Sequence, residues 1–136
     1  MQTINHLIVY AEDDMDDLNL VKEAFSRQDG HTADIIHADN GLRALKLLEE
    51  MADKNELPCL IILDINMPVM DGKEALSRIR QHDRLKHIPV TVFTTSNSKM
   101  DAMFAHRYGA DFITKPLRYA EVEELAMRFI QRCEVH

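Results

Sequence analysis

The feature that most constrains the fold is a short apolar segment that ends at a single carboxylate. Residues 60–63 read Leu-Ile-Ile-Leu, and Asp64 follows them directly. Pro58 and Pro68 leave too few residues between them for a helix, because proline interrupts helical hydrogen bonding. A run that is apolar on both faces is typical of a central parallel strand covered by helices. Asp64 is therefore predicted at the carboxyl end of a buried strand, where open α/β sheets bind ligands.

The alternation of a short strand with an amphipathic helix recurs along the whole chain. Strands are predicted at His6–Ala11, Ala33–Ala38, Leu60–Leu63, Val90–Thr94 and Asp111–Thr114. Apolar residues at helical spacing follow each strand, beginning near Met15, Leu42, Gly72, Met100 and Val122. The first of these helices is expected to close at Asp29-Gly30. This pattern predicts a single α/β domain over residues 1–136, a doubly wound, five-stranded parallel sheet with helices on both faces.

Composition and charge exclude several classes of function. A content of 46% hydrophobic and 29% charged residues is typical of a globular domain. The net charge of −7 argues against nucleic-acid binding, which needs a basic surface. No apolar run approaches the ~18 residues of a membrane span, and no secretory signal is evident. Cys59 and Cys133 lie in apolar stretches without metal-ligand spacing, so a cytoplasmic protein with two reduced thiols is expected.

Distinctive polar residues stand at the carboxyl ends of four predicted strands. The first strand runs into Glu12, Asp13 and Asp14, the third into Asp64, the fourth ends at Thr94, and the fifth is followed by Lys115. These ends lie on one edge of a parallel sheet, so the side chains are expected to meet. Clustered carboxylates repel each other unless a cation lies between them, and hard oxygen ligands suit Mg²⁺. The sequence therefore predicts a magnesium site with a nearby ammonium group.

Four motifs together resemble the receiver domain of two-component response regulators. They are Glu12-Asp13 after the first strand, Asp64 within LDINMPVMDG, Thr94 within PVTVFTT, and GADFITKP from Gly109 to Pro116. The intervals between the motifs also fit, and the resemblance covers nearly the whole chain. The loop before Leu60 is longer than in many members of the family. The resemblance implies the flavodoxin-like strand order 2-1-3-4-5.

The resemblance also implies a function, that of a phosphoacceptor switch. Asp64 would accept a phosphoryl group from a histidine kinase or a histidine phosphotransfer protein, so the chain would catalyse only its own phosphorylation and dephosphorylation. Asp13 would bind Mg²⁺ directly, Glu12 through water, and the main-chain carbonyl of Asn66 would be a further ligand. Lys115 would pair with Asp64 and then with a phosphoryl oxygen.

The output side of the switch is likewise implied by the resemblance. Thr94 would bond the new phosphoryl oxygens, and Phe112 occupies the aromatic switch position, although a permanently buried phenylalanine is the alternative. The Lys115–Pro116 peptide bond is expected to be cis. The signal would pass to a downstream protein, with homodimerisation through the fourth helix, fifth strand and fifth helix as a hypothesis. The acidic entry to the first helix and the long loop are similar to those of single-domain regulators paired with phytochrome-type or hybrid kinases.

A phosphatase and a flavodoxin-like cofactor binder are the alternative functions, and Asp14 is an acidic residue without an assigned role. A haloacid-dehalogenase-type phosphatase also uses an aspartate nucleophile with Mg²⁺, but it carries a second aspartate two residues later, where this chain has Asn66. A flavodoxin-like cofactor binder needs a neutral phosphate loop, which residues 12–14, Glu-Asp-Asp, do not provide. Asp14 itself is expected to be a solvated charge or a helix N-cap rather than a metal ligand.

Overall fold

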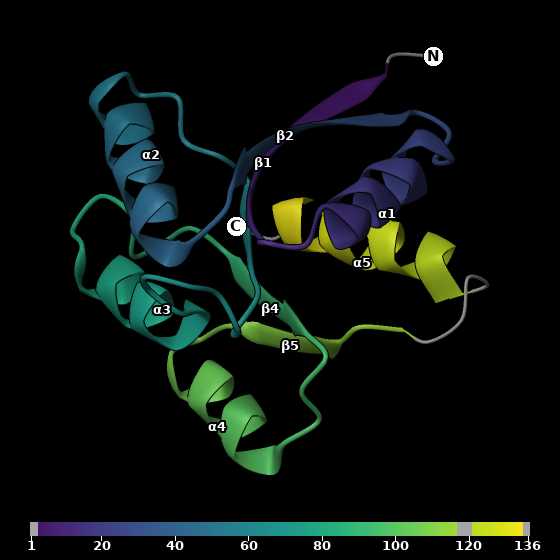
Figure 1. Cartoon of the computed structure of the whole chain (residues 1–136). Helices are drawn as coiled ribbons and strands as arrows, with labels where there is room; N and C mark the ends of the chain where they lie inside the picture. The colour runs from purple at the N-terminus through teal and green to yellow at the C-terminus, as the bar shows by residue number, and fades with distance from the viewer. Residues whose placement is uncertain (1–2, 117–120, 135–136) are drawn as a thin grey trace.

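The computed structural model describes residues 3–116 and 121–134 and has strands and helices in strict alternation (Figure 1). The strands are β1 Ile4–Ala11, β2 His31–Ala38, β3 Leu60–Leu63, β4 Val90–Thr94 and β5 Asp111–Thr114. The helices are α1 Met15–Ser26, α2 Gly41–Asp53, α3 Gly72–Gln81, α4 Lys99–Arg107 and α5 Val122–Glu134. All ten elements were predicted from the sequence.

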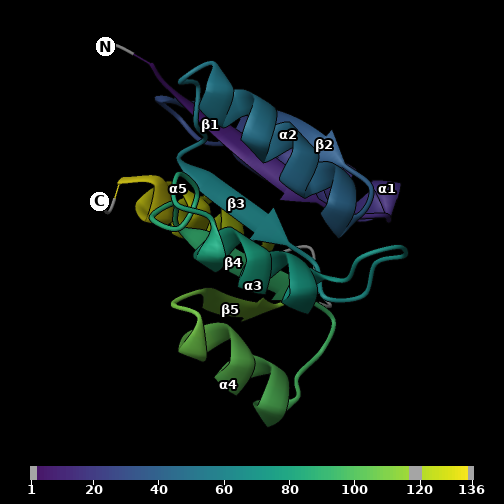
Figure 2. The same cartoon turned by 90° about the vertical axis from the view of Figure 1, so that its left-hand side faces the viewer.

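The five strands form one parallel sheet in the order β2-β1-β3-β4-β5, which confirms the predicted topology (Figure 2). Helices α1 and α5 cover one face, while α2, α3 and α4 cover the other (Figure 1). Because successive strand residues point to opposite faces, Leu60 and Ile62 enter the core beside α1 and α5, whereas Ile61 and Leu63 enter the opposite core. All four side chains are fully buried, as expected for a central strand.

Four helices begin at a polar residue that caps free main-chain N–H groups. Asp14 accepts hydrogen bonds from the main-chain N–H groups of Asp16 and Asp17 at the start of α1. The helices that follow are capped in the same way by Asn40, Asp71 and Ser98. Such caps satisfy donors that have no partner inside the helix. The prediction that Asp14 is an N-cap is therefore confirmed.

Strands β1 and β2 are longer than the apolar pattern predicted. Strands β1 and β2 each begin two residues earlier, and Ile4 pairs with His31 at their amino ends. Polar cross-strand contacts support this extension: Thr32 donates to Asn5 over 2.8 Å, and Asn5 donates to Asp34 over 2.9 Å. Hydrophobic alternation cannot reveal pairing that depends on such polar side chains.

The two cysteines are joined, contrary to the expectation of free thiols. Cys59 precedes β3, Cys133 lies near the end of α5, and a disulfide connects them with their Cα atoms 4.8 Å apart. The sequence could not show this, because 74 positions separate the two residues and only the fold brings them together. Among the described residues, no helix has the length and apolar character needed to cross a bilayer.

Candidate functional site

The site is centred on the ammonium group of Lys115, just beyond β5 at the carboxyl edge of the sheet. Its Nζ atom donates to Glu12 Oε1 over 2.6 Å, to Asp17 Oδ2 over 2.7 Å and to Asp64 Oδ2 over 3.0 Å. The side chain of Lys115 is only 9% exposed, and its main-chain N–H donates to the Thr94 carbonyl over 2.7 Å. An ammonium has three N–H donors, so these three carboxylates use all of them.

The three carboxylates that follow β1 and β3 lie close together at this edge, as the strand-end pattern predicted. Oxygen atoms of Glu12, Asp13 and Asp64 lie within 4.8 Å of one another. Glu12 and Asp64 are buried, whereas Asp13 is exposed. Glu12 also accepts a hydrogen bond from the Tyr10 hydroxyl over 3.0 Å. The cluster combines hard oxygen donors with an excess of negative charge, which is the chemistry that a divalent cation such as Mg²⁺ or Mn²⁺ requires.

Burial and crowding change the proton affinities of these groups. Burial raises the pKa of Glu12 to about 7, and the neighbouring Asp64 adds to this effect, although Lys115 opposes it. Burial alone would lower the pKa of Lys115, but its hydrogen bonds to Asp17 and Glu12 and the charge of Asp64 outweigh it, so the pKa is raised. Lys115 is therefore charged at any physiological pH. Burial, followed by the charge of Glu12, raises the pKa of Tyr10, so its hydroxyl stays protonated and donates.

A glycine allows α3 to start directly behind Asp64. A Cβ atom added at Gly72 would lie 2.0 Å from the main-chain oxygen of Asp64, so no other residue fits there without moving the backbone. The N–H of Gly72 donates to Ile65 O over 2.9 Å and closes the loop after β3. In the same loop Val69 has φ of 66°, a conformation that β-branched residues rarely adopt. Asp64 is thus held against a tightly turned loop.

The predicted switch residues lie on the neighbouring strands. Thr94 is fully buried at the end of β4, and its Oγ1 accepts from the Ser96 N–H over 3.4 Å. Ser96 in turn donates to Asp101 Oδ2 over 2.6 Å. Phe112 on β5 is half-buried and packs against the core beneath α4, beside Val92 in the strand register. Phe112 is thus neither fully enclosed nor fully exposed.

The structure contradicts the prediction for the Lys115–Pro116 bond and shows where Asn66 lies. The Lys115–Pro116 bond is trans, so the expected cis bond is wrong. The main-chain N–H of Lys115 is bonded to Thr94 O in this arrangement, and that bond sets the direction of the chain as it leaves β5. Asn66 is exposed, and its N–H donates to Asp64 Oδ1 over 3.4 Å, which places its backbone next to the cluster.

Asp17 is a member of the site that the sequence did not reveal. It lies in the first turn of α1, where the helix dipole favours an acid, and is 26% exposed. The structure brings its carboxylate to Lys115 as closely as that of Glu12. One available signal was its position on the side of α1 that also carries the buried Leu18 and Val21.

Comparisons with known proteins agree with this geometry. The family model of the response regulator receiver domain matches residues 8–127. Response regulator Rcp1 of Synechocystis is 35% identical over 112 residues, which are 80% of this chain and 76% of Rcp1. The probable methanogenesis regulatory protein FilR2 of Methanothrix harundinacea is 34% identical over 119 residues, covering 86% of this chain and 76% of that protein. The phosphatase alternative gains no support from these relatives.

Solved structures share the fold over almost the whole chain. The phosphorylated cyanobacterial phytochrome response regulator RcpA has a TM-score of 0.81 at 27% identity, covering 93% of this chain and 95% of RcpA. The Mn²⁺-bound form of Rcp1 has a TM-score of 0.79 at 30% identity, covering 90% of each chain. With the matched sequence motifs and the shared sheet order, these comparisons show that the chain belongs to the response regulator receiver domains of two-component signal transduction.

Proposed function

We propose that the chain is a Mg²⁺-dependent phosphoacceptor in which Asp64 receives a phosphoryl group from a phosphohistidine. The observation that carries the proposal is the ammonium of Lys115, which lies 3.0 Å from a buried carboxylate at the end of the central strand. In the transfer, an Asp64 oxygen forms a bond to phosphorus as the phosphorus–nitrogen bond of the donor breaks. The product is an acyl phosphate on Asp64.

The residues around Asp64 suit the requirements of phosphoryl transfer, which are alignment and neutralisation of charge. Lys115 can follow the developing charge because its Nζ already contacts Asp64, and burial strengthens such an interaction. Glu12, Asp13 and Asp64 present the hard oxygens that fit Mg²⁺, with the Asn66 carbonyl as a further ligand. Bound Mg²⁺ would neutralise phosphoryl oxygens. The Mn²⁺-bound form of the similar protein Rcp1 supports the binding of a divalent ion.

Thr94 and Phe112 supply the response to phosphorylation in this proposal. The Thr94 hydroxyl is buried at the end of β4, the strand next to the one that ends at Asp64. It turns toward the new phosphoryl oxygens, and its hydrogen bond from the Ser96 N–H is then broken. Ser96 is bonded to Asp101 on α4, so the loop between β4 and α4 moves with it. Phe112, half-buried under α4, then changes its position as the loop moves.

Incubation with acetyl phosphate and Mg²⁺, followed by intact mass measurement, tests the proposal. A single acid-stable, base-labile phosphoryl group is expected, and it should fail to form when EDTA is added first. Asp64→Asn should remove it completely, while Asp83→Asn, a change of the same charge at an exposed position, should not. Phosphorylation that persists in Asp64→Asn would refute the assignment of the acceptor.

The partners follow from the same proposal. Receiver domains interact with histidine kinases. We infer that the phosphoryl donor is a cytoplasmic histidine kinase or histidine phosphotransfer protein. The similarity to RcpA, a phytochrome response regulator, suggests a donor of the phytochrome-associated type. The α4–β5–α5 face is the proposed route to a downstream protein or a second copy of the chain. Met100, Met103 and Met127 are 78%, 63% and 44% exposed on these helices. Sedimentation with and without beryllofluoride tests dimerisation, and an unchanged monomer in both would exclude it.

A further inference from the structure

A second cluster of metal-ligating side chains lies near the amino ends of the strands, opposite the Asp64 site. Donor atoms of His6, Cys59 and Cys133 all lie within 4.8 Å of one another. They come from β1, from the residue before β3 and from the end of α5. His6 is 5% exposed and Cys133 is 4% exposed. A nitrogen donor and two sulfur donors are thus gathered in a largely buried place.

Two further polar side chains surround the same histidine. His6 Nε2 lies 2.9 Å from His31 Nδ1, and the two rings are stacked with centroids 5.2 Å apart. Donor atoms of His6, His31 and Glu134 also fall within 4.8 Å of one another. A histidine that binds a metal is usually oriented by a hydrogen bond to its ring, and His31 gives His6 such a partner.

We propose that in the reduced protein His6, Cys59 and Cys133 form a binding site for a thiophilic divalent cation such as Zn²⁺. The disulfide is then the oxidised, metal-free form of the same site. Two thiolates and an imidazole are a donor set that zinc accepts, and they leave a fourth position for water. The site is independent of phosphorylation at Asp64, which lies at the other end of the sheet.

Thiol chemistry connects the two forms. Oxidation by a low-molecular-weight disulfide transfers two electrons from the two protein thiols to that reagent, releasing two small thiols as the Cys59–Cys133 bond forms. A thiolate ligates the metal only in the reduced form, so oxidation must expel the ion. Reducing compartments keep most disulfides open, so a protein of the cytoplasm would spend time in the metal-binding form.

The chemistry of His6 favours a soft or borderline cation over Mg²⁺. Burial, and then the charge of His31, lowers the pKa of His6, so the ring is neutral near pH 7 and has a lone pair to offer. Sulfur and imidazole donors prefer Zn²⁺ or Co²⁺, whereas Mg²⁺ prefers carboxylates and water. The two edges of the sheet should therefore select different cations.

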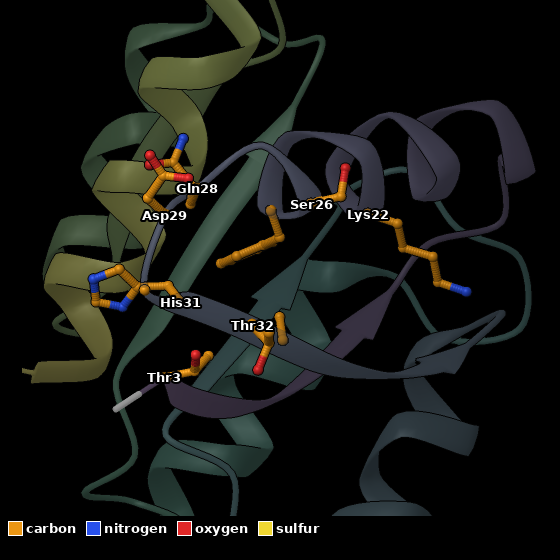
Figure 3. Close-up of a pocket in the computed structure, with 10 residues that line it drawn as sticks. Thr3, Lys22, Ser26, Gln28, Asp29, His31 and Thr32 are labelled. Atoms are coloured by element: carbon orange, nitrogen blue, oxygen red, sulfur yellow. The ribbon is translucent and has the colours of Figure 1, made fainter. Parts of the chain in front are cut away.

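A surface hollow borders His31, the neighbour of His6. A surface hollow of about 420 Å³ lies between the end of α1 and the start of β2, and His31 is among its lining residues (Figure 3). Gln28 and Asp29 flank the same opening, and Thr3 lies below it (Figure 3). His31 thus borders this hollow, and its Nδ1 also lies 2.9 Å from His6 Nε2.

Cobalt titration of the whole chain tests the proposal. The chain, carrying Asp64→Asn to weaken the carboxylate site, is reduced with a phosphine, freed of metal and titrated with Co²⁺. Thiolate ligation produces a near-ultraviolet charge-transfer absorption, which should saturate at a single Co²⁺ per chain and disappear when Zn²⁺ is added. The same chain oxidised with a low-molecular-weight disulfide should give none. Absence of the absorption in the reduced form, or its presence in both forms, would overturn the proposal.

Substitutions identify the ligands. Cys59→Ser and Cys133→Ser should each abolish or strongly diminish the absorption, His6→Gln should weaken Co²⁺ binding the most among histidine changes, and His31→Gln should weaken it about ten-fold. His87→Gln, an exposed histidine before β4, is the matched control and should change nothing. Unaltered binding in folded His6→Gln overturns the three-ligand site. If circular dichroism shows that a variant does not fold, the test is the difference in Co²⁺ absorption between the reduced and the oxidised chain with His6, Cys59 and Cys133 intact.

Discussion

The two edges of this sheet hold opposite kinds of chemistry. At the carboxyl edge, Glu12, Asp13 and Asp64 gather hard oxygen atoms, and the ammonium of Lys115 donates to Glu12 and Asp64. At the amino edge, two sulfur atoms lie beside the imidazole of His6. The difference teaches that a parallel sheet separates its functional groups by strand direction, because every strand contributes the same end to the same edge. A reagent that acts on one edge should therefore leave the other intact.

The largest contrast between the edges is expected from two glycine substitutions. Gly72→Ala forces a Cβ atom to within 2.0 Å of the Asp64 carbonyl oxygen, so the free energy of unfolding should fall by more than about 4 kcal/mol and phosphorylation should be lost. Gly30→Ala, at the amino end of β2, meets no atom within 4 Å and is strained only by its φ of +80°. That change should cost about 1 kcal/mol and leave phosphorylation unchanged. Urea denaturation and intact mass measure both effects, and equal losses would contradict the contrast.

Opening the disulfide should weaken the fold without stopping the chemistry at Asp64. The bond spans 74 positions, and closing a loop of that length restricts the unfolded chain enough to stabilise the fold by about 4 kcal/mol. Urea midpoints of oxidised and reduced protein, both in EDTA, measure this difference. A Cys59→Ser, Cys133→Ser double variant should match the reduced protein and ignore reductant. Identical midpoints for the two redox forms would show that the crosslink does not constrain the unfolded chain.

The two edges should also respond to pH in opposite directions. The folded-state pKa of Glu12 is raised from 4.5 to about 7, so the folded protein holds that proton more tightly and stability falls by roughly 1–3 kcal/mol as pH rises between those values. The pKa of His6 is lowered in the folded state, so its contribution is present above the ordinary value of 6.5 and is lost as pH falls below it.

Stability measured against pH in metal-free buffer separates these two contributions. Glu12→Gln should remove the fall in stability between pH 4.5 and about 7, and His6→Gln should remove the loss that begins below 6.5. Mg²⁺ should reduce the Glu12 effect because it binds the ionised carboxylates, and it should not alter the His6 effect. A Glu12→Gln variant that keeps the wild-type pH profile would exclude Glu12 as its source.

The smallest effect is expected from a substitution of Asp17, which competes with Asp64 for the ammonium of Lys115. Asp17→Asn removes a negative charge 2.7 Å from Lys115 Nζ, so the ammonium is freer to meet a phosphoryl oxygen. Phosphorylation by acetyl phosphate should become about five-fold faster, and stability should fall by about 1 kcal/mol. Asp16→Asn makes the same change of charge on the exposed neighbour. If both variants respond alike, the effect is one of net charge rather than of contact with Lys115.

The fold was predictable because each level of the sequence pointed to the same answer. The apolar run at Leu60–Leu63, the acidic cap at Asp14 and the repeated strand–helix alternation are local signals that survive into the structure. The meeting of Glu12, Asp64 and Lys115 followed from the direction of parallel strands alone. The strand order needed the family resemblance, since alternation does not reveal which strands are neighbours.

The remaining features depend on contacts between distant segments, which spacing along the chain does not encode. Asp17 reaches Lys115 across 98 positions through the packing of α1 against the sheet. Cys59 and Cys133 show no ligand spacing in the sequence, although they meet in space with His6. The trans isomer of the Lys115–Pro116 bond also differs from the cis isomer that the family resemblance implied.

The fully occupied ammonium of Lys115 has a mechanical consequence for α1. A hydrogen bond weakens steeply once its heavy atoms separate beyond about 3.5 Å, so a displacement of α1 by about 1 Å would detach Asp17 from Lys115. A protein that binds the outer surface of this helix can thereby release Lys115 from Asp17 without contacting Asp64 itself. The rate of phosphorylation at Asp64 would then be controlled by a partner bound to α1, at a distance from the reacting oxygen.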